Sequence, residues 1–362
     1  MQSPRTSVSL KQWVGHRARE ALLLPALLRQ AKPRVAFLPS SSGTGAGQLR
    51  AVFVAQRLRA QGWNAVSIPT QLEMVQCKRF LKRLKPDVLV FQTCRHPFVD
   101  LRHAFGFPYI LDLDDADFHD ASLRQRMEDT ATDAVGIIAG SRYIDTWARQ
   151  FNQTCQIVWT GSPISAGRRP SHAERSKDLP IVTWAQASPL GYPAELDFVA
   201  RILRAVAERD AGFSVRLYGV NSVQDQEKVR QIMGLGKVRI ETLPSLPYDR
   251  FLASLREVSV GLSPIAPESP FSRGKSFGKI LGYLDAMVPV VCSDHGDHAL
   301  FFTKGTGFVS NDEGEWQSHV LELIRNVTLR DEMARKAFAN FKDRLSLERA
   351  SDLVGKFIKS VI

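Results

Sequence analysis

Short apolar segments alternate with helical patterns along most of the chain, and this alternation constrains the fold more than any other feature. The segments form two sets of six, and most of them are apolar over much of their length. The first set is 34–39, 64–69, 86–92, 109–115, 134–141 and 155–161, and the second is 180–186, 214–220, 238–243, 258–264, 288–294 and 305–311. Strands that are apolar on both faces are typical of parallel sheets covered by helices. We therefore predict an α/β fold with right-handed crossovers.

A polar segment separates the two sets, which predicts two Rossmann-like domains whose parallel sheets face across a cleft. Residues 165–178 contain glycine and proline but no periodic apolar set, as in a linker. The expected division is a basic helical segment at 1–32, one domain at 33–164, a second domain at 179–340, and a C-terminal helix at 341–362 that could return to the first domain. Ligands of such sheets bind at the carboxyl ends of the strands.

Composition narrows the class of protein further. Hydrophobic residues make up 44% of the chain and charged residues 23%, which is globular composition. The four cysteines, Cys77, Cys94, Cys155 and Cys292, contain no CxxC pair, so we expect reduced thiols in a cytoplasmic protein. No apolar run reaches the roughly 18 residues that a membrane-spanning helix needs, and the first residues lack the core of a signal peptide.

The formal net charge of +11 favours a polyanionic partner, namely nucleic acid, an anionic membrane face or a phosphorylated substrate. Nucleic acid is disfavoured because the basic runs contain neither a recognition module nor interleaved aromatic residues. The segment Leu10–Arg34 is basic and partly amphipathic. Two interpretations stay open for it: a helix packed on the domain, or an interfacial helix on the inner face of an anionic membrane.

A glycine-rich turn, "GTGAG" at 43–47, follows the first strand. Gly43, Gly45 and Gly47 have the spacing GxGxG and not GxGxxG, and the second strand does not end on an acidic residue. Both features argue against a dinucleotide, and the GKS/T of a P-loop is missing as well. The remaining alternatives are a backbone that a large ligand approaches closely and a plain tight turn.

Two further groups follow strands in the first half of the chain. Asp112, Asp114 and Asp115 end one strand, where they could line a site, cap a helix or hold a divalent cation. We favour lining or capping and expect no metal. Arg95 and His96 follow another strand, and His96 is a candidate catalytic residue, although a lone histidine is more often structural.

The segment Arg273–Asp294 contains the clearest candidate anion site. Arg273, Lys275 and Lys279 surround two glycines before a predicted helix, and an apolar strand follows that helix. Helix starts bind phosphate through free backbone N–H groups, and adjacent cations add charge. On the predicted helix Lys275, Lys279 and Gly282 fall opposite the apolar face. A pyrophosphate is the natural ligand, with a solvated basic turn as the alternative.

Four stretches together resemble the group-1 glycosyltransferases of the GT-B fold. "RGKSFGKILGYLDAMVPVV" is similar to their donor-binding segment, and "IVTWAQASPLGYPAELDFVARIL" is similar to the first strand, loop and helix of their C-terminal domain. "VAFLPSSSGTGAGQLRA" and "YILDLDDADF" resemble the matching pieces of the N-terminal domain. The similarity extends over most of the chain from about residue 33. Each motif alone is loose, whereas their order and spacing together are more specific.

The resemblance implies an enzyme that moves a sugar from a nucleotide-diphosphate sugar to a glycan or lipid-linked acceptor, with retention of configuration and without a bound metal or cofactor. The donor would bind the C-terminal domain as a substrate. Catalytic candidates are Arg273, Lys275, Lys279 and His96, and donor-binding candidates are Gly43, Gly45, Gly47, Arg50, Ser188, Tyr192, Gly274, Ser276 and Gly282. Arg50 follows the glycine-rich turn, where the resemblance implies a basic residue near the donor phosphates.

One departure from the family pattern concerns two glutamates, the second of which contacts the ribose in many relatives. Gly274 and Gly282 stand at those positions, and Met287 stands where a glycine is expected before the strand. A ribose contact and a charge near the sugar would then be missing. This leaves an alternative open: a catalytically silent GT-B shell that serves as a binding or partner subunit.

Overall fold

The computed structural model describes residues 21, 23–40, 45–93, 106–175, 179–266, 270–275 and 277–362, apart from the side chain of Lys279. The chain forms two compact units. Unit 1 consists of Met1–Ala139, Asp145–Val158 and Ser351–Ile362, and unit 2 consists of Gly140–Ile144 and Trp159–Ala350.

Unit 1 is built on a parallel sheet of six strands in the order β2-β1-β3-β4-β5-β6. The strands are β1 (Arg34–Leu38), β2 (Asn64–Ser67), β3 (Val88–Gln92), β4 (Tyr109–Leu113), β5 (Gly136–Ala139) and β6 (Cys155–Ile157). All six lie within the segments predicted from the sequence, and the central ones are buried along their whole length. Parallel pairing with helices on both faces explains their continuous apolar character.

Among the described residues, the helical elements of this half of the chain are α2 (Leu24–Leu28), a π-helical turn (Gly47–Val52), α3 (Phe53–Ala60), α4 (Met74–Leu84), a 3-10 turn (Asp117–His119), α5 (Arg124–Asp133) and α6 (Arg142–Ala148). The helix predicted at 49–62 therefore begins earlier than expected: residues 45 and 46 are already helical, the π-helical turn follows, and the helix continues as α3. A capping box between Glu73 and Gln76 starts α4, and Lys85 ends it in the left-handed conformation.

Unit 2 repeats the design with a second parallel sheet, in the order β12-β11-β10-β7-β8-β9. Its strands are β7 (Ile181–Trp184), β8 (Ser214–Leu217), β9 (Arg239–Thr242), β10 (Val260–Ser263), β11 (Val290–Cys292) and β12 (Phe308–Val309). Each lies within one of the six segments predicted for the second domain. The predicted α/β class with two parallel sheets is confirmed.

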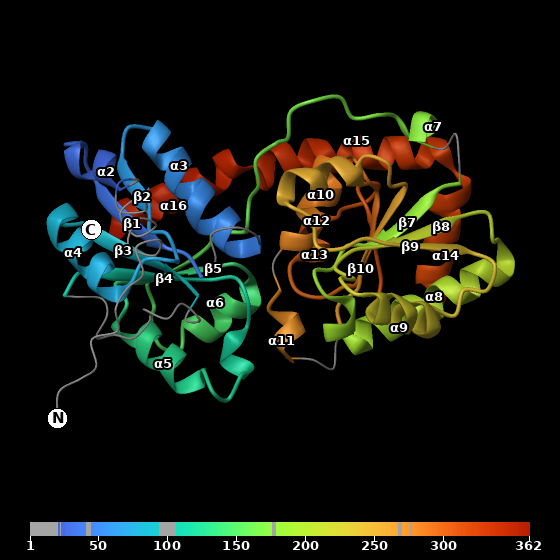
Figure 1. Ribbon diagram of the computed structural model, residues 1–362, viewed down its shortest axis with the longest axis horizontal. Helices are drawn as coiled ribbons and strands as arrows, with labels where there is room; N and C mark the ends of the chain where they lie inside the picture. The colour runs from blue at the N-terminus through green and yellow to red at the C-terminus, as the bar shows by residue number, and fades with distance from the viewer. Residues whose placement is uncertain are drawn as a thin grey trace. The chain divides into compact units, whose positions relative to one another are not determined.

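Helices cover both faces of the second sheet (Figure 1). They are α7 (His172–Arg175), a 3-10 turn (Pro189–Gly191), α8 (Pro193–Arg209), α9 (Val223–Met233), α10 (Tyr248–Leu255), α11 (Pro270–Arg273), α12 (Gly278–Asp285), α13 (His298–Phe301), α14 (Glu313–Arg325) and α15 (Val327–Arg344). α8, α9 and α14 pack together on one face, whereas α10, α12 and α15 pack together on the other.

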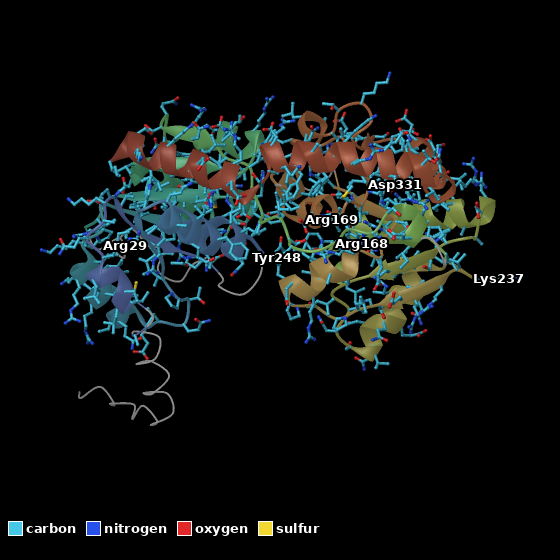
Figure 2. All side chains as sticks on the ribbon, turned by 90° about the horizontal axis from the view of Figure 1, so that it is seen from above. Arg29, Arg168, Arg169, Lys237, Tyr248 and Asp331 are labelled. Atoms are coloured by element: carbon cyan, nitrogen blue, oxygen red, sulfur yellow. The ribbon has the colours of Figure 1, made fainter. Side chains whose placement is uncertain are left out.

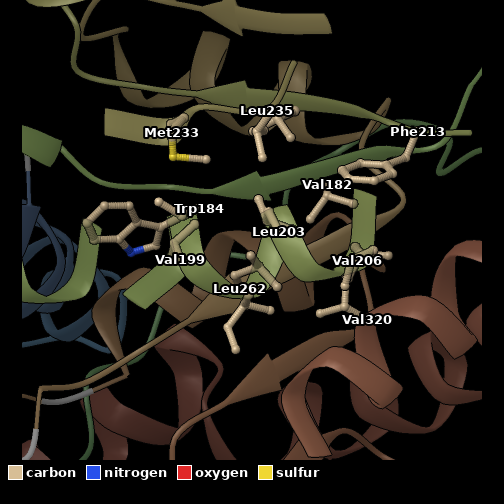
Figure 3. Close-up of a cluster of buried hydrophobic side chains, with 14 of the residues drawn as sticks. Val182, Trp184, Val199, Leu203, Val206, Phe213, Met233, Leu235, Leu262 and Val320 are labelled. Atoms are coloured by element: carbon tan, nitrogen blue, oxygen red, sulfur yellow. The ribbon is translucent and has the colours of Figure 1, made fainter. Parts of the chain in front are cut away.

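The core between β7 and α8 shows how the sequence builds this layer (Figure 3). Val182 and Trp184 project from β7 toward Val199 and Leu203 of α8, and all four side chains are at most 1% exposed. Val199 and Leu203 are four residues apart, so they lie on the same side of the helix. The burial of each such side chain contributes about 1.5–3 kcal/mol to folding.

The predicted linker at 165–178 is packed on unit 2 over the part that the structure describes. Arg169 forms an ion pair with Asp285 of α12 at 2.8 Å between Nη2 and Oδ1, and Figure 2 shows Arg169 beside Arg168 in this segment. Arg175 donates Nη1 to the Val258 carbonyl at 2.8 Å and Nη2 to the Ala286 carbonyl at 2.6 Å. The segment is attached to unit 2 by arginine side chains and not by an apolar face. Its packing therefore leaves no hydrophobic periodicity in the sequence.

The last helix, α16 (Leu347–Val361), contributes its residues from Ser351 onward to unit 1. Phe357 packs on β5, where a Cβ added at Gly136 would lie 2.7 Å from the Phe357 ring. A second contact joins α16 to the end of α3, where Gln61 donates to Asp352 at 2.7 Å. In the described part of the chain, no helix combines the length and apolarity that crossing a membrane requires.

Candidate functional site

The carboxyl end of β7 is the topological switch point of the second sheet. β7 lies between β8 and β10. The strands that follow β7 in sequence are first added on the β8 side of the sheet and then, from β10 onward, on the other side. Open parallel sheets bind ligands at such a point because the loops on either side diverge and leave a crevice. The loop after β7 leads into α8, and the segment after β10 contains α11 and the turn before α12.

Tyr283 of α12 fixes the geometry of this switch point. Its hydroxyl accepts a hydrogen bond from the Ala185 N–H at 2.6 Å, and it donates toward the Leu262 carbonyl at 3.1 Å and the Thr183 carbonyl at 3.3 Å. The ring packs directly on Gly261, where an added Cβ would lie 2.8 Å from the ring. Burial raises the pKa of Tyr283 far above its usual value, so the hydroxyl stays neutral and keeps its proton as a donor.

Lys275 lies in the turn between α11 and α12, and its amine meets the start of α8. The Nζ atom lies 3.9 Å from the centroid of the Tyr192 ring and 3.7 Å from Oε1 of Glu195. Ser272 donates its hydroxyl to the same Glu195 oxygen at 3.1 Å. The Lys275 side chain is 12% exposed and that of Glu195 is 6% exposed, so the pair is largely withdrawn from water.

The arrangement places a cation beside the positive end of a helix. Tyr192 is the N-cap of α8, which is 17 residues long, and Glu195 lies in its first turn. The helix dipole favours a carboxylate at that position, and Glu195 in turn holds the Lys275 amine against the Tyr192 ring, a cation–π contact. An incoming anion would meet the amine together with the N–H groups that follow Pro193 in the first turn of α8.

Buried hydrogen-bond donors lie at the same end of β7. Within the described part of the chain, Trp184 Nε1 and Gln186 Nε2 are buried and have no acceptor. An unpaired buried donor costs about 1–3 kcal/mol. Gly219, which follows β8, adopts a φ of +75° and lies so close to Ala187 that a Cβ would be 2.1 Å from its carbonyl oxygen. The loops after β7 and β8 are therefore in direct contact.

The structure brings together two of the predicted donor-site residues, Lys275 and Tyr192, at 3.9 Å. Ser188 is exposed in the same loop as Tyr192, Arg273 is exposed at the end of α11, and Gly274 is buried in the turn before Lys275. Ser276 and the side chain of Lys279 lie outside the described residues, as do Gly43 and His96.

Sequence reasoning missed three members of the site: Glu195, Ser272 and Gln186. The signal for Glu195 was available, because Tyr-Pro-Ala-Glu is a helix start with an acidic residue in the first turn. No local pattern indicated that Ser272 would contact Glu195, which is 77 residues earlier in the chain.

Gly282 lies on the side of α12 that faces away from the sheet, as predicted, but this side is apolar and buried as well, and the contact between Gly282 and the donor stays a prediction. A Cβ at Gly282 would lie 2.9 Å from Leu255 Cδ1 and 3.0 Å from Phe251 Cε1, both on α10. The helical period correctly placed Gly282 on the side of α12 that faces away from the sheet. That side is covered by α10, which the period could not show. Met287, which stands in the place of an expected glycine, does adopt the left-handed φ of 55° that glycine favours.

We predict that Gly282→Glu destabilises the protein by about 3 kcal/mol or more, because a carboxylate would be buried between α12 and α10 without a partner. The matched control is Gly278→Ala at the start of the same helix, where an added Cβ meets nothing within 4 Å. That variant should keep or slightly raise the stability. Urea unfolding of both variants measures the difference, and a Gly282→Glu protein as stable as the wild type would contradict the packing described.

Arg50 forms a buried ion pair with Asp112 in unit 1, and the phosphate contact that the resemblance implies stays a prediction. It is 4% exposed, its Nε donates to Asp112 Oδ1 at 2.9 Å, and its Nη1 donates to the Val158 carbonyl at 2.9 Å. Burial alone would lower the pKa of Arg50, but the adjacent Asp112 carboxylate outweighs it and the pKa is raised. Of the glycines before it, Gly45 has a φ of +64° and Gly47 is the first residue of the π-helical turn.

A buried polar chain joins the carboxyl ends of β1, β3 and β4. Ser40 donates its hydroxyl to Gln92 Oε1 at 2.6 Å, and Gln92 Nε2 donates to Asp114 Oδ1 at 3.0 Å. Burial, reinforced by the charge of Asp115, raises the pKa of Asp114 to about 8. A carboxylic acid that keeps its proton near neutral pH is a hydrogen-bond donor at this edge of the sheet.

The raised pKa predicts how stability depends on pH. Because the pKa of Asp114 is about 8 in the folded state and about 3.9 in an unfolded chain, the folded state binds the proton more tightly. The contribution of the protonated Asp114 carboxyl to stability is fully present below about pH 4 and is lost as the pH rises through about 8. Asp114→Asn removes this titration. As the pH rises from about 4 to about 8, the stability of the variant should therefore increase relative to that of the wild type.

The measurement is the difference in unfolding free energy between Asp114→Asn and the wild type, taken by urea titration from about pH 5 to about pH 9. Asp343→Asn, at an exposed position of α15, is the control. A difference that stays constant with pH for Asp114→Asn would contradict the assignment.

The described residues contain no group of three or more histidine, cysteine, aspartate or glutamate side chains placed to hold a metal ion. Asp112 forms the ion pair with Arg50, and Asp114 belongs to the polar chain with Gln92. Asp115 is half-buried in the loop after β4.

A hollow of ≈ 940 Å³ lies on unit 2 at the amino ends of the strands, away from the switch point, and Ile181 and Ser214 are among its lining residues. Its best-buried cation, Arg216, is paired with Glu241 at 2.7 Å and Glu257 at 2.8 Å. These charges satisfy one another, so we assign them to the structure of the sheet.

Comparison with solved structures identifies the fold. The chain superimposes on sucrose-phosphate synthase from Thermosynechococcus elongatus with a TM-score of 0.70 and 12% identity, over 91% of this chain and 99% of that one. Anabaena HepE in complex with UDP and glucose gives a TM-score of 0.70 and 15% identity, over 91% and 100%. A mutant of S. aureus TarM, in complex with fondaparinux, α-GlcNAc-glycerol and UDP, gives 0.59 and 14%, over 78% and 58%.

These similarities show that the chain has the GT-B fold of glycosyltransferases, with two Rossmann-like parallel sheets, as the sequence motifs predicted. No protein-family model matches the sequence, and a search of curated proteins finds no match.

Proposed function

We propose that this protein is a glycosyltransferase that takes a sugar from a nucleoside-diphosphate sugar bound at the switch point of unit 2. The observation that carries the proposal is the position of Lys275, whose amine lies 3.9 Å from the Tyr192 ring at the start of α8. The strand ends of such sheets are where nucleotides bind, and a helix start with a lysine is suited to a diphosphate. The solved structures of similar fold include HepE with UDP and glucose.

The main catalytic requirement of sugar transfer is stabilisation of the charge that develops on the leaving group. The bond between the anomeric carbon and the oxygen of the β-phosphate breaks, and the acceptor oxygen forms a new bond to that carbon while the acceptor proton passes to the departing diphosphate. Negative charge grows on the departing diphosphate. Lys275 and the first N–H groups of α8 would stabilise that charge, and such preorganised stabilisation is often the largest contribution to catalysis.

Further parts of the proposal come from the family resemblance. The acceptor is a glycan or a lipid-linked precursor, such as those of polysaccharide biosynthesis, the anomeric configuration is retained, and neither a metal nor a cofactor takes part. The acceptor would contact unit 1, and the protein would act in the cytoplasm.

We expect nucleoside diphosphates to stabilise the folded protein. At a hundredfold excess over Kd, a ligand that binds only the folded state adds about 2.7 kcal/mol, which should raise Tm by several degrees. Thermal unfolding with UDP, GDP, ADP and TDP, against the monophosphates as controls, identifies the nucleotide. If none of the four diphosphates shifts Tm, the donor site is wrongly placed.

A double-mutant design separates binding from stability at Lys275. Lys275→Gln should weaken binding of the preferred diphosphate about tenfold, since a charge-assisted hydrogen bond is worth about 1.5–3 kcal/mol. It should also lower stability by about 1–3 kcal/mol, because Glu195 stays buried after its cation is removed. Adding Glu195→Gln should restore the stability but not the affinity.

The control is Lys237→Gln, at an exposed lysine of unit 2 that precedes β9 (Figure 2). Calorimetric titration of the four proteins gives the affinities, and urea unfolding gives the stabilities. Unchanged affinity in Lys275→Gln would remove this residue from the site.

The alternative function is a silent GT-B subunit that binds a partner or a nucleotide without transfer. The observation in its favour is that Glu195 already neutralises the Lys275 amine at 3.7 Å. Incubation with nucleotide sugars distinguishes the two, because an active transferase slowly releases the nucleoside diphosphate even to water. A protein that binds the diphosphate but never releases it from any nucleotide sugar would favour the silent subunit.

A further inference from the structure

We propose that one surface of unit 1 docks on an anionic lipid bilayer. We name it the α2–α4 face. It is made of the exposed apolar residues Leu24, Leu28, Met74 and Val75 and the exposed cations Lys78, Arg79, Lys82 and Arg83. This inference goes beyond sugar transfer and holds whether or not the protein is an enzyme.

Exposed large apolar side chains concentrate on this face. Leu28 is 81% exposed, Val75 65%, Leu24 51% and Met74 38%. They account for half of the eight large apolar side chains that are exposed in the described residues. Single exposed apolar residues are ordinary, but a group of them on neighbouring elements marks an interaction surface.

The two helices that carry these residues are in contact and enclose an apolar hollow. α2 packs on α4 (Figure 1), and a hollow of ≈ 260 Å³ lies between them. Its wall includes Leu23, Leu27 and Phe80, with Arg79 and Arg83 on the α4 side. Arginine stems can cover apolar surface while their charged ends reach outward.

The spacing along α4 combines apolar and cationic residues on its exposed side. Val75, Arg79 and Arg83 are four residues apart and form one row, while Cys77, Phe80, Leu81 and Leu84 are buried on the opposite side. Met74, Lys78 and Lys82 form the adjacent row. Each row therefore begins with an apolar residue and continues with two cations, as in helices that lie in a membrane interface.

The surrounding sequence concentrates positive charge in the same part of the chain. Residues 21–85 contain eleven lysines and arginines and one acidic residue, Glu73. Residues 1–85 hold 15 of the 48 basic residues but only 2 of the 37 acidic ones, so the rest of the chain is slightly acidic. Arg29, which follows α2, is among these cations and lies at this end of unit 1 (Figure 2).

Lipid fits this combination better than an acidic protein does. Leu24, Leu28 and Val75 project from short helices as separate side chains, and a bilayer accepts such side chains between its head groups without a matching pocket. Anionic lipid provides the opposite charge over a wide area, so the cations need no individual partner. We therefore assign the α2–α4 face to a peripheral contact with anionic phospholipid.

The test is co-sedimentation of the full-length protein with vesicles. Vesicles of phosphatidylcholine with about one third phosphatidylserine present an anionic surface, and pure phosphatidylcholine is the neutral reference. The wild type should bind the anionic vesicles at low salt and lose most of this binding as salt rises, because electrostatic attraction is screened. Binding of the wild type to the neutral vesicles should be much weaker than its binding to the anionic vesicles at low salt.

Two pairs of variants separate the apolar and the charged contributions. Leu28→Ser with Val75→Ser should reduce binding about tenfold, since both side chains would otherwise leave water. The control is Val223→Ser on α9 of unit 2, where the valine is 80% exposed. Lys82→Gln with Arg83→Gln should reduce binding by more than about tenfold at low salt, since each cation near the surface adds attraction. Lys228→Gln with Arg230→Gln, both exposed on α9, is its control.

Three results would overturn the proposal. The first is equal binding of both α2–α4 variants and the wild type to anionic vesicles. The second is the same loss in the α9 controls, which would indicate attraction to net charge alone. The third is a wild type that ignores the vesicles but forms dimers by light scattering, with Leu28→Ser and Val75→Ser abolishing them, because the face would then bind a second copy. Thermal unfolding of each variant verifies that it is folded.

Discussion

The hydroxyl of Tyr283 is the interaction on which the candidate site depends most directly. It joins α12 to the Ala185 N–H after β7 and to the Leu262 carbonyl of β10, the two strands between which the chain changes direction. Because the ring rests on Gly261, helix and sheet approach each other closely at this point. The turn that carries Lys275 comes just before α12, so the position of the lysine follows from this contact.

The pairing of Lys275 with Glu195 changes how the basic segment should be understood. A free lysine would attract any anion. The Lys275 amine, held 3.7 Å from a carboxylate and 3.9 Å from an aromatic ring, instead has a fixed position, and the carboxylate balances its charge. Such a site favours a ligand that fits the geometry over one that merely carries charge. A strong diffuse field is more useful for a wide anionic surface, and the exposed cations of α4 provide one.

Much of the fold could be predicted from the sequence because buried parallel strands leave a strong local signal. All twelve strands lie within predicted segments. The site was less accessible, because its contacts join residues far apart in the chain: Arg50 with Asp112, and Ser272 with Glu195. Gly282 shows a different limit. A helical period identifies the side that faces the sheet, but it cannot show that a second helix, α10, covers the other side.

The last described helix, α16, completes unit 1, whose strands lie much earlier in the chain. Phe357 fills the space beside Gly136, and the Lys359 amine lies 5.2 Å from the centroid of the Trp63 ring. During synthesis the strands of unit 1 leave the ribosome long before the residues of α16 that cover them, so unit 1 stays partly uncovered until α16 has been made. Unit 2, which is contiguous from Trp159 to Ala350 apart from Gly140–Ile144, can fold earlier. The order of folding would then be the reverse of the order of synthesis.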